Sequence, residues 1–304
     1  MRNVALALCC VVVLMSVVVT LFQFPDQNLY VTTCDVGQGD GILIQKGYTQ
    51  VIIDTGNDAY KLFSCLDQFM PRGDRVVELL VITHPDLDHY GVARSLLDRY
   101  QVQTLFTLPY AKDDEEFDAF VAAVRAEEST GMRVLFPEKT PRSFLFSGVA
   151  LRQLWPRIAP HYAKAKSTHS SNDAEGDDPR FFATTEDVND QSIVFLLEYG
   201  DFSALFTGDL EATGELALVV SDVLIDVDVL KVGHHGSKTS TTESFLHNTR
   251  PEIAVISAGR DNTYGHPASE TLERLHNYAV AEIVRTDSEG TITIGINKTA
   301  YWIE

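Results

Sequence analysis

A continuous apolar run in the first half of the chain, Val76–Thr83, passes directly into the segment His84–His89, which reads HPDLDH. An apolar run of this kind predicts a strand buried on both faces, as in sheets that are covered by helices. Gly91–Tyr100 follows with apolar residues at helical spacing, so the polar segment lies on a loop between strand and helix. The chain must therefore fold around a covered sheet that leaves the end of this strand accessible.

The loop after this strand is rich in potential metal ligands, namely His84, Asp86, Asp88 and His89. A loop can fan such closely spaced side chains around two centres, whereas an extended strand would send them to alternate faces. Imidazole with carboxylate suits Zn²⁺ or Mn²⁺, and paired carboxylates favour the harder ion. The alternative is a helix cap made by one aspartate. It explains neither histidine, so we predict a metal-binding loop.

Two segments in the second half of the chain also follow apolar strand runs. Asp209 comes directly after Phe202–Thr207 and Gly208, where its carboxylate can bridge two metals. Gly-Asp alone is an ordinary turn, but the His234–His235 pair after the next run stands between glycines and is hard to explain by packing. One histidine can bind metal while the other is a proton donor or substrate contact. Which of the two is the ligand stays open.

Hydroxyl and basic side chains follow the double histidine. Ser237, Lys238 and Ser240 would suit the phosphate oxygens of a substrate. For Ser240 a structural helix cap is the alternative.

Strand and helix patterns follow the same order in both halves: paired strands, then helix and strand in alternation. The predicted strands are Leu29–Thr33, Gly41–Gln45, Gln50–Asp54, Val76–Thr83, Thr104–Thr107, Arg133–Phe136, Val149–Leu154, Ser192–Tyr199, Phe202–Thr207, Asp228–Val232, Ile253–Ser257, Glu282–Arg285 and Thr291–Ile296. The predicted helices are Tyr60–Met70, Gly91–Tyr100, Asp113–Glu128, Ala212–Val220, Thr241–Asn248 and Ala268–Tyr278. Two such halves predict an α/β fold of four layers within one domain, residues 25–304. Residues 156–190 lack apolar periodicity and are expected to form a surface insertion, partly disordered.

The N-terminal segment Val4–Phe22 is almost wholly apolar. As a helix rising about 1.5 Å per residue it reaches roughly 28 Å, near the thickness of a bilayer core. We therefore expect residues 1–24 to be a transmembrane anchor in the cell membrane, with a buried core helix as the alternative. Arg2 would keep the N-terminus in the cytoplasm and leave the folded body on the extracytoplasmic side.

The cysteines, Cys9, Cys10, Cys34 and Cys65, form no CxxC pair and no even framework. They are expected to be small buried apolar residues without disulfides.

The charge balance is acidic, with 24 Lys and Arg against 43 Asp and Glu and a formal net charge of −19. Duplex binding normally depends on basic residues that displace counterions, so a surface this acidic repels nucleic acid in bulk. A nucleic-acid substrate would have to be held by metal ions and local basic residues.

Six segments in order resemble the signature of the metallo-β-lactamase fold, most closely its branch at the C-terminus of the DNA-internalisation competence protein ComEC. They are Asp35–Asp40 (DVGQGD), Ile53–Gly56 (IDTG), His84–His89, Thr207–Asp209, His234–Ser237 and Tyr264–Pro267 (YGHP). The resemblance extends from about Leu29 to Ile294. It implies an αββα sandwich with two metal ions at the strand ends between the halves.

The resemblance also implies a ligand set. His84, Asp86 and Asp209 would hold the first metal; Asp88, His89, Asp209 and one of His234 or His235 would hold the second. The general fold has a second histidine where this chain has Asp86. It also has a histidine before the bridging aspartate, where this chain offers only Asn189 or Ser192 as a weak ligand or water holder.

Further residues are implied around these ligands. Asp35 and Asp40 belong to a turn near the site, and Asp54 would orient the ligands, with a turn cap as its alternative. His266 would contact substrate or complete the site, with a turn residue as its alternative. Asp88, His235 and His266 are the candidates for catalysis.

We expect metal-assisted hydrolysis of a phosphodiester, in single-stranded DNA during uptake, with DNA-uptake channel proteins as partners. One alternative is a membrane-anchored hydrolase of another phosphoester, such as a choline-phosphate ester, or of a lactam. Another is a non-catalytic module that guides DNA, which the missing histidine and the acidic charge favour.

Overall fold

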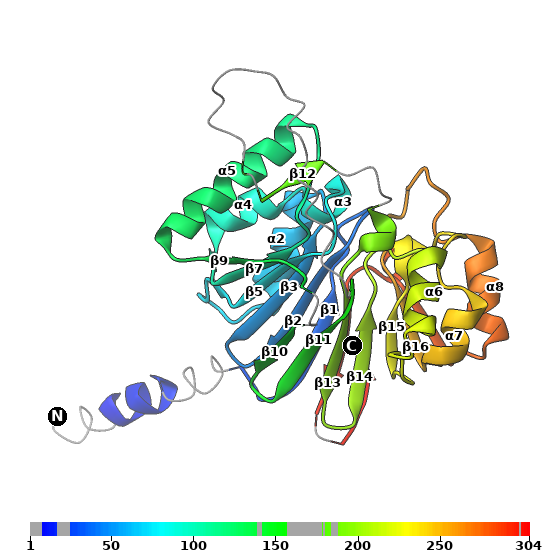
Figure 1. Ribbon diagram of the computed structural model, residues 1–304. Helices are drawn as coiled ribbons and strands as arrows, with labels where there is room; N and C mark the ends of the chain where they lie inside the picture. The colour runs from blue at the N-terminus through cyan, green and yellow to red at the C-terminus, as the bar shows by residue number, and fades with distance from the viewer. Residues whose placement is uncertain are drawn as a thin grey trace, which may run out of the picture.

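The structure is a computed structural model, and it describes residues 8–16, 25–138, 142–156, 178, 180–183, 188–297 and 299–304. Two large sheets face each other (Figure 1). In spatial order, the first contains β19 (Tyr301–Ile303), β18 (Ile292–Ile296), β1 (Leu29–Thr33), β2 (Gly41–Lys46), β3 (Thr49–Thr55), β5 (Leu79–Ile82), β7 (Thr104–Thr107) and β9 (Arg133–Leu135). The second contains β10 (Ser143–Phe146), β11 (Val149–Trp155), β13 (Val194–Tyr199), β14 (Phe202–Phe206), β15 (Val229–Lys231), β16 (Ile253–Ile256) and β17 (Glu282–Arg285).

Helices cover the outer face of each sheet, which makes four layers (Figure 1). The first sheet is covered by α2 (Ala59–Phe69), α4 (Ala93–Arg99) and α5 (Glu115–Thr130), and the second by α6 (Ala212–Val220), α7 (Glu243–Thr249) and α8 (Ser269–Asn277). Shorter helices are α3 (Leu87–Tyr90), α9 (Thr286–Glu289) and the 3-10 turns η1 (Asn189–Gln191) and η2 (Gly233–Gly236). The predicted mixed α/β fold is confirmed.

Alternating side chains on the strands explain this layering. In β3, Val51 and Ile53 face the second sheet, while Ile52 faces the helices. In β13, Phe195 and Leu197 face the first sheet. Because successive residues of a strand point to opposite faces, apolar residues at every position bury both faces. The continuous apolar runs in the sequence therefore specify strands between two layers.

The strands that carry the polar motifs run parallel to their neighbours. β5 pairs in parallel with β3, and β14, β15 and β16 pair in parallel in the second sheet. Parallel strands end at the same edge of a sheet, so segments that follow them meet there. A backbone bond from Ile193 N–H to the Thr83 carbonyl, at 3.0 Å, joins the two halves at this edge.

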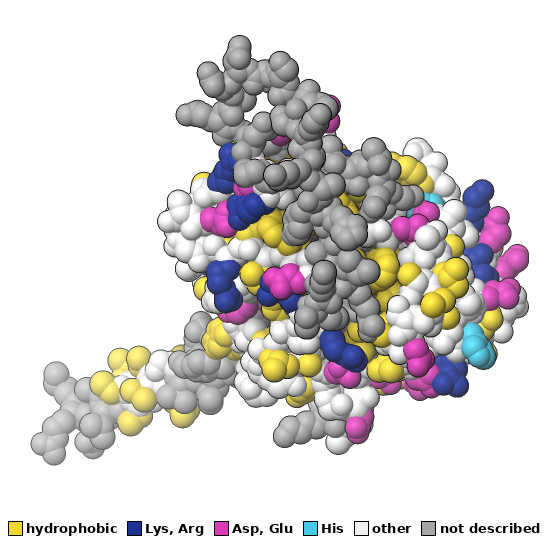
Figure 2. Space-filling model, in the orientation of Figure 1, with side chains coloured by type: hydrophobic (Ala, Val, Ile, Leu, Met, Phe, Trp, Pro, Cys, Tyr) yellow, Lys and Arg dark blue, Asp and Glu magenta, His cyan; other side chains and the backbone are white. Residues whose placement is uncertain are grey.

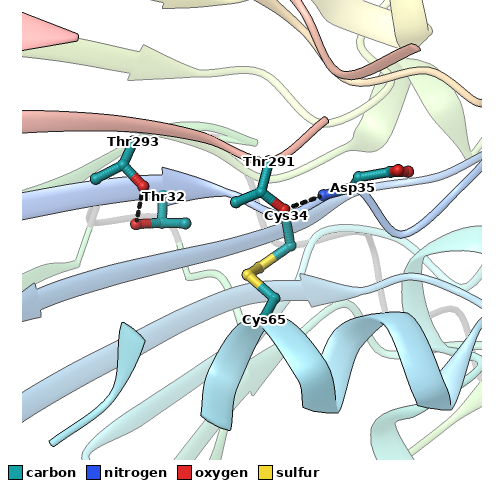
Figure 3. Close-up of a disulfide and its surroundings, with 6 residues drawn as sticks. All are labelled: Thr32, Cys34, Asp35, Cys65, Thr291 and Thr293. Carbon is teal, nitrogen blue, oxygen red and sulfur yellow. Dashed lines mark hydrogen bonds between the residues drawn. A yellow bond between two sulfur atoms is a disulfide. The ribbon is translucent and has the colours of Figure 1, made fainter. Parts of the chain in front are cut away.

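A disulfide joins Cys34, just after β1, to Cys65 in α2 (Figure 3). The expectation of no disulfide was wrong. The two residues are 31 positions apart, and only the packing of α2 against the first sheet brings their Cα atoms to 5.9 Å. Both side chains are buried, as expected, whereas Cys9 and Cys10 are exposed. No local spacing signals this bond, because it depends on how a helix docks on a sheet.

Residues 8–16 of the expected membrane anchor are helical, and their large apolar side chains are exposed (Figure 2). Residues 1–7 and 17–24 lie outside the described part of the chain. Within the described residues, we find no helix whose length and hydropathy would let it span a bilayer.

Other predicted elements differ in detail. The run Val76–Thr83 forms two strands, because β4 (Val76–Val77) pairs with β6 (Gln101–Val102) while β5 joins the large sheet. Most of the expected insertion 156–190 lies outside the described residues. Within it, β12 (Phe182–Ala183) pairs in parallel with β8 (Tyr110–Ala111).

Candidate metal centre

The loop after β5 is held by Asp54, at the end of β3. Thr83 donates its backbone N–H and its hydroxyl to the Asp54 carboxylate, at 2.7 and 2.6 Å. The same carboxylate lies 2.8 Å from His89 Nδ1. Because a carboxylate only accepts, Nδ1 carries the proton, and Nε2 of His89 points its lone pair toward Asp209. Asp54 therefore orients the loop and one of its histidines.

A glycine makes room for this loop beside the turn Asp35–Asp40. A Cβ atom on Gly39 would lie 2.1 Å from the Asp88 carbonyl oxygen, and the φ angle of Gly39 is +124°. Asp40 N–H donates to the same carbonyl at 3.2 Å. Only glycine allows this approach, which explains why Gly39, the second glycine of the DVGQGD segment, is a glycine.

Asp209 enters the centre from the second half. Its backbone N–H donates to the Ser192 hydroxyl at 3.1 Å, and its side chain is buried. The carbonyl of Gly208, the residue before it, accepts a hydrogen bond from His234 N–H at 3.2 Å. The loops after β14 and β15 are thus fixed to each other at the strand edge.

The double histidine occupies a left-handed turn. His234 and His235 have φ angles of 46° and 54°, which is uncommon for residues other than glycine. His235 Nδ1 lies 3.0 Å from the Ser257 carbonyl, which can only accept, so its Nε2 is the free ligand atom. His234 Nδ1 faces the Glu211 carboxylate at 2.6 Å. Both Nε2 atoms thus turn toward Asp209.

We call the group of Asp88, His89, Asp209 and His235 the second position. The His89 and His235 Nε2 atoms each lie 3.2 Å from an Asp209 carboxylate oxygen, and His235 Nε2 lies 3.3 Å from Asp88. Ligand atoms about 2.0–2.1 Å from a tetrahedral cation lie roughly 3.3–3.4 Å from one another. The three pairs therefore have the spacing expected of ligands that share a cation.

We call the group of His84, Asp86 and Asp209 the first position, and His234 lies beside it. His84 Nε2 lies 3.6 Å from Asp86 and 4.0 Å from Asp209, and His234 Nε2 lies 3.8 Å from Asp209. These distances are longer than those of the second position. The hydroxyl of Ser192, one of the two residues expected to replace a histidine, is 3.4 Å from His84 Nδ1.

Buried ligand atoms at the centre lack hydrogen-bond partners. Among the described residues they include Nε2 of His84, His89 and His235 and Oδ1 of Asp209. Buried polar atoms are rarely left unpaired, so such a convergence calls for a ligand. Imidazole nitrogens and carboxylate oxygens are the donors that Zn²⁺ and Mn²⁺ take. The residues present therefore fit a divalent cation.

The electrostatics also favour positive charge at this point. Burial alone would lower the pKa of His89 and His235, but Asp209 together with the other nearby carboxylates outweighs it and raises both pKa values well above their usual range. Burial would likewise raise the pKa of Asp209, yet the two imidazoles hold it well below its usual value. A cation between these atoms would take the place of the imidazole protons.

A family model described as the metallo-beta-lactamase superfamily matches residues 34–260. The chain belongs to the metallo-β-lactamase superfamily. ComE operon protein 3 of Bacillus subtilis is 31% identical over 306 residues, which cover 94% of this chain and 35% of that protein. Recombination protein 2 of Haemophilus influenzae is 30% identical over 275 residues, which cover 89% of this chain and 29% of that protein. The resemblance inferred from the six segments is confirmed, and the chain spans about a third of the length of these relatives.

Solved structures share the fold. The metallo-β-lactamase fold protein YhfI of Bacillus subtilis superposes with a TM-score of 0.51 at 9% identity, covering 91% of this chain and 100% of that one. The diiron β-hydroxylase CmlA of Streptomyces venezuelae gives 0.51 at 12% identity, covering 90% of this chain and 55% of that one. At these identities the likeness extends to architecture alone.

The other residues predicted around this superfamily centre fall into two groups. Asp40 faces His235 Nδ1 at 3.4 Å and is buried, as a supporting residue should be. Asp35, in contrast, pairs with Lys61 at 3.0 Å and contacts none of the ligand candidates in the described contacts. Asn189 gives its backbone carbonyl to Ser192 N–H.

The serine hydroxyls after the double histidine are bonded to other groups of the protein. The Ser240 hydroxyl is buried and donates to the Gly233 carbonyl at 2.6 Å. The Ser237 hydroxyl bonds to that of Thr239 at 2.7 Å. These bonds favour the structural alternative for Ser240. Lys238 is exposed.

His266 closes one side of the centre. Its ring lies 5.4 Å from that of His234 and 6.4 Å from that of His235. Burial, together with these two histidines, lowers its pKa.

Sequence reasoning missed charged residues that hold the ligands. Lys112 Nζ lies 2.5 Å from Asp86, and Lys231 Nζ lies 2.6 Å from Asp40. Glu211 holds His234. The signal available was position: Lys231 ends the strand before the double histidine, and Glu211 follows Asp209 closely.

Proposed function

We propose that this chain is a metal-dependent phosphodiesterase that cleaves DNA, single-stranded during uptake into the cell. The observation that carries the proposal is the convergence of buried imidazole Nε2 atoms on the Asp209 carboxylate. Members of the superfamily are usually metal-dependent hydrolases, and relatives are named for competence and recombination. DNA is therefore the substrate class that the names and the chemistry jointly favour.

Two divalent cations, Mn²⁺ or Zn²⁺, would be held at the first and second positions. When bound there, such cations supply Lewis-acid chemistry that polarises phosphoryl oxygens and lowers the pKa of water. Asp209 would serve both positions, because its Oδ1 faces His89 while its Oδ2 faces His84 and His235. Asp54 and the Ser257 carbonyl keep the lone pairs of His89 and His235 aimed inward.

The two histidines of the pair would have different roles, one as a metal ligand and the other as a proton donor. His235 is buried and both of its ring nitrogens face partners, which suits a ligand. His234 is partly exposed, and Glu211 fixes its ring. His234 is therefore the better placed of the two to hold a proton for the leaving oxygen, with His266 beside it.

We further propose an extracytoplasmic location in the cell membrane, with residues 1–24 as the anchor and residues 25–304 as the hydrolase domain. The apolar segment Val4–Phe22 and the Cys34–Cys65 bond support this location independently. Disulfides persist in oxidising compartments and are rare in the cytosol. DNA-uptake channel proteins would then be the partners, since the competence relatives are about three times as long as this chain.

An extracytoplasmic location predicts that Cys34 and Cys65 are oxidised to a disulfide in cells. The test uses a variant that lacks Cys9 and Cys10, so that Cys34 and Cys65 are its only cysteines. Cells are quenched with acid and denatured, and a thiol-reactive polymer is added. We expect the polymer to shift the electrophoretic mobility of the protein only after reduction. A shift without reductant would mean free thiols and would remove the argument for an oxidising compartment.

Cleavage is tested by stripping the full chain of metal and restoring it. We expect no activity on a labelled single-stranded oligonucleotide in EDTA and cleavage after addition of Mn²⁺ or Zn²⁺, with metal content measured by mass spectrometry. Asp209→Asn should lose more than about 100-fold in kcat/KM, because several kcal/mol of charge stabilisation depend on the cations. Asp201→Asn is the matched control, in the exposed turn between β13 and β14.

The outcome also separates the alternatives. Binding of the oligonucleotide without cleavage under any metal condition would replace the nuclease with the non-catalytic module. Hydrolysis of a phosphocholine ester or a lactam, with DNA left intact, would keep the hydrolase and change its substrate.

A further inference from the structure

An exposed aromatic ring stands beside the centre on the loop between β16 and α8. The Tyr264 side chain is 71% exposed, and its ring stacks on that of His266 with a centroid distance of 5.9 Å and an interplanar angle of 24°. The His266 ring in turn lies 5.4 Å from that of His234. The rings form a row that leads from solvent to the first position.

Hydrogen bonds hold this loop in place. The Asn262 side chain accepts from His266 N–H at 3.1 Å and donates to the carbonyls of His266 and Gly259 at 2.6 and 2.7 Å. Gly259 N–H donates to the Gln38 side chain at 3.2 Å, which fixes the loop to the turn beside Asp88. The exposed ring is therefore presented on a braced segment.

We propose that Tyr264, backed by His266, is a stacking platform for one nucleobase of a single-stranded nucleic acid bound at the centre. This inference rests on the proposed phosphodiesterase function. One face of the Tyr264 ring packs against His266, and its high exposure leaves the ring accessible to a ligand. Stacking a base on an aromatic side chain stabilises single-strand complexes by about 1–3 kcal/mol and tolerates any base.

The charge of the chain makes such a contact necessary. With a formal net charge of −19, the protein gains little from release of counterions, so affinity must come from local contacts. In a duplex both faces of each base are covered by its own stack, and reaching the platform would require unstacking. The platform therefore selects single strands.

The test measures stacking without catalysis. Metal is removed with EDTA, and oligonucleotides with one 2-aminopurine at successive positions are titrated with the full chain, so that fluorescence quenching reports the base on the ring. A second series replaces the same positions by an abasic site. We expect one position where quenching is strong and where the abasic site weakens binding by about tenfold.

Variants assign the effect to the ring. Tyr264→Ala should lose the quenching and bind the intact oligonucleotide as weakly as the abasic one, whereas Tyr264→Trp should keep both the quenching and the preference. Tyr48→Ala is the matched control, because Tyr48 is an exposed tyrosine in the turn between β2 and β3. With Mn²⁺ or Zn²⁺ present, kcat/KM should follow the same pattern.

Two failures are distinguishable. If Tyr264→Ala weakens binding of intact and abasic oligonucleotides equally, or weakens neither, the platform is wrong whatever the enzyme cleaves. If no oligonucleotide is cleaved with any metal while base-dependent quenching persists, the nuclease function fails and the platform stands. Binding of a phosphocholine ester, but of no oligonucleotide, at Tyr264 would overturn the choice of ligand.

Discussion

The two positions around Asp209 differ in how far their ligands are already in place. At the second position three pairs of ligand atoms lie 3.2–3.3 Å apart, and the supporting groups are Asp54, Asp40 and the Ser257 carbonyl. At the first position the corresponding distances are 3.6–4.0 Å. There Asp86 is paired with Lys112, so one of its carboxylate oxygens is already engaged.

One cluster of ligands can therefore contain two sites that bind metal with unequal affinity. A preformed site loses little free energy to rearrangement when it binds a ligand. A site whose ligands are paired elsewhere must first break those pairs. We therefore expect stepwise binding, with the second position filled at the lower metal concentration.

The largest effect should come from Lys231, which supports the second position through Asp40. The side chains of Lys231 and Asp40 are 2% and 1% exposed, and their charged atoms lie 2.6 Å apart. Lys231→Met leaves the Asp40 carboxylate buried without its partner and should lower the free energy of unfolding by about 3–5 kcal/mol. Urea denaturation in EDTA measures this loss.

Lys238→Met, at an exposed position seven residues further along the chain, is the control for removal of a lysine. The double variant Lys231→Met/Asp40→Leu should recover much of the loss, because no charge is then left unpaired. If Lys231→Met alone left the free energy of unfolding at its wild-type value, the second position would not depend on this pair.

Direct ligands should affect the two binding steps separately. In a calorimetric titration of stripped protein with Mn²⁺, His89→Ala should weaken the tighter step by at least about 100-fold, since even supporting residues contribute 10–100-fold. Asp86→Ala should remove the weaker step and leave the tighter one. If Asp86→Ala abolished the tighter step instead, the order of the positions would be reversed.

Lys112 should weaken metal binding at the first position by a smaller factor, because it competes with the cation for Asp86. Its side chain and that of Asp86 are 35% and 32% exposed, and a pair this accessible contributes about 0.2–1 kcal/mol. Lys112→Met frees Asp86 and should tighten the weaker step by up to about fivefold. Lys61→Met is the control, because Lys61 pairs with Asp35 away from the ligands. Unchanged or weaker binding would show that Lys112 does not compete with the cation.

Much of this arrangement could be predicted from the sequence because it is local. The bounds of β1, β7, β17 and α6 follow from periodicity and were predicted without error. The segments that follow buried parallel strands had to meet at one edge, so Asp209 and the double histidine could be placed near His84 in advance.

What could not be predicted depends on contacts between distant segments. Lys231 contacts Asp40 across the two halves, and Cys34 meets Cys65 only because α2 docks on the first sheet. The strands β10 and β19 were missed, since their side chains are largely half-exposed or exposed and lack a buried apolar run. The inequality of the two positions also comes from such contacts.

The smallest effect concerns Glu215 of α6, which supports the loop of the double histidine. Glu215 is buried and accepts the Thr242 N–H at 2.8 Å and that of Thr241. Burial outweighs these bonds and raises its pKa above the ordinary value of 4.5. Just above pH 4.5 the folded state therefore binds this proton more tightly than the unfolded state, and stability falls as pH rises through the folded pKa.

Glu215→Gln should remove this fall, so that urea denaturation in EDTA gives a flatter dependence on pH over that interval than in wild type. Glu243→Gln, an exposed glutamate in the first turn of α7, should keep the wild-type slope. Because Glu215 lies in α6, whose N-cap residue Glu211 holds His234, its substitution should change the weaker Mn²⁺ step more than the tighter one. An effect confined to the tighter step would mean that α6 supports the second position, and the division between the two positions would have to be redrawn.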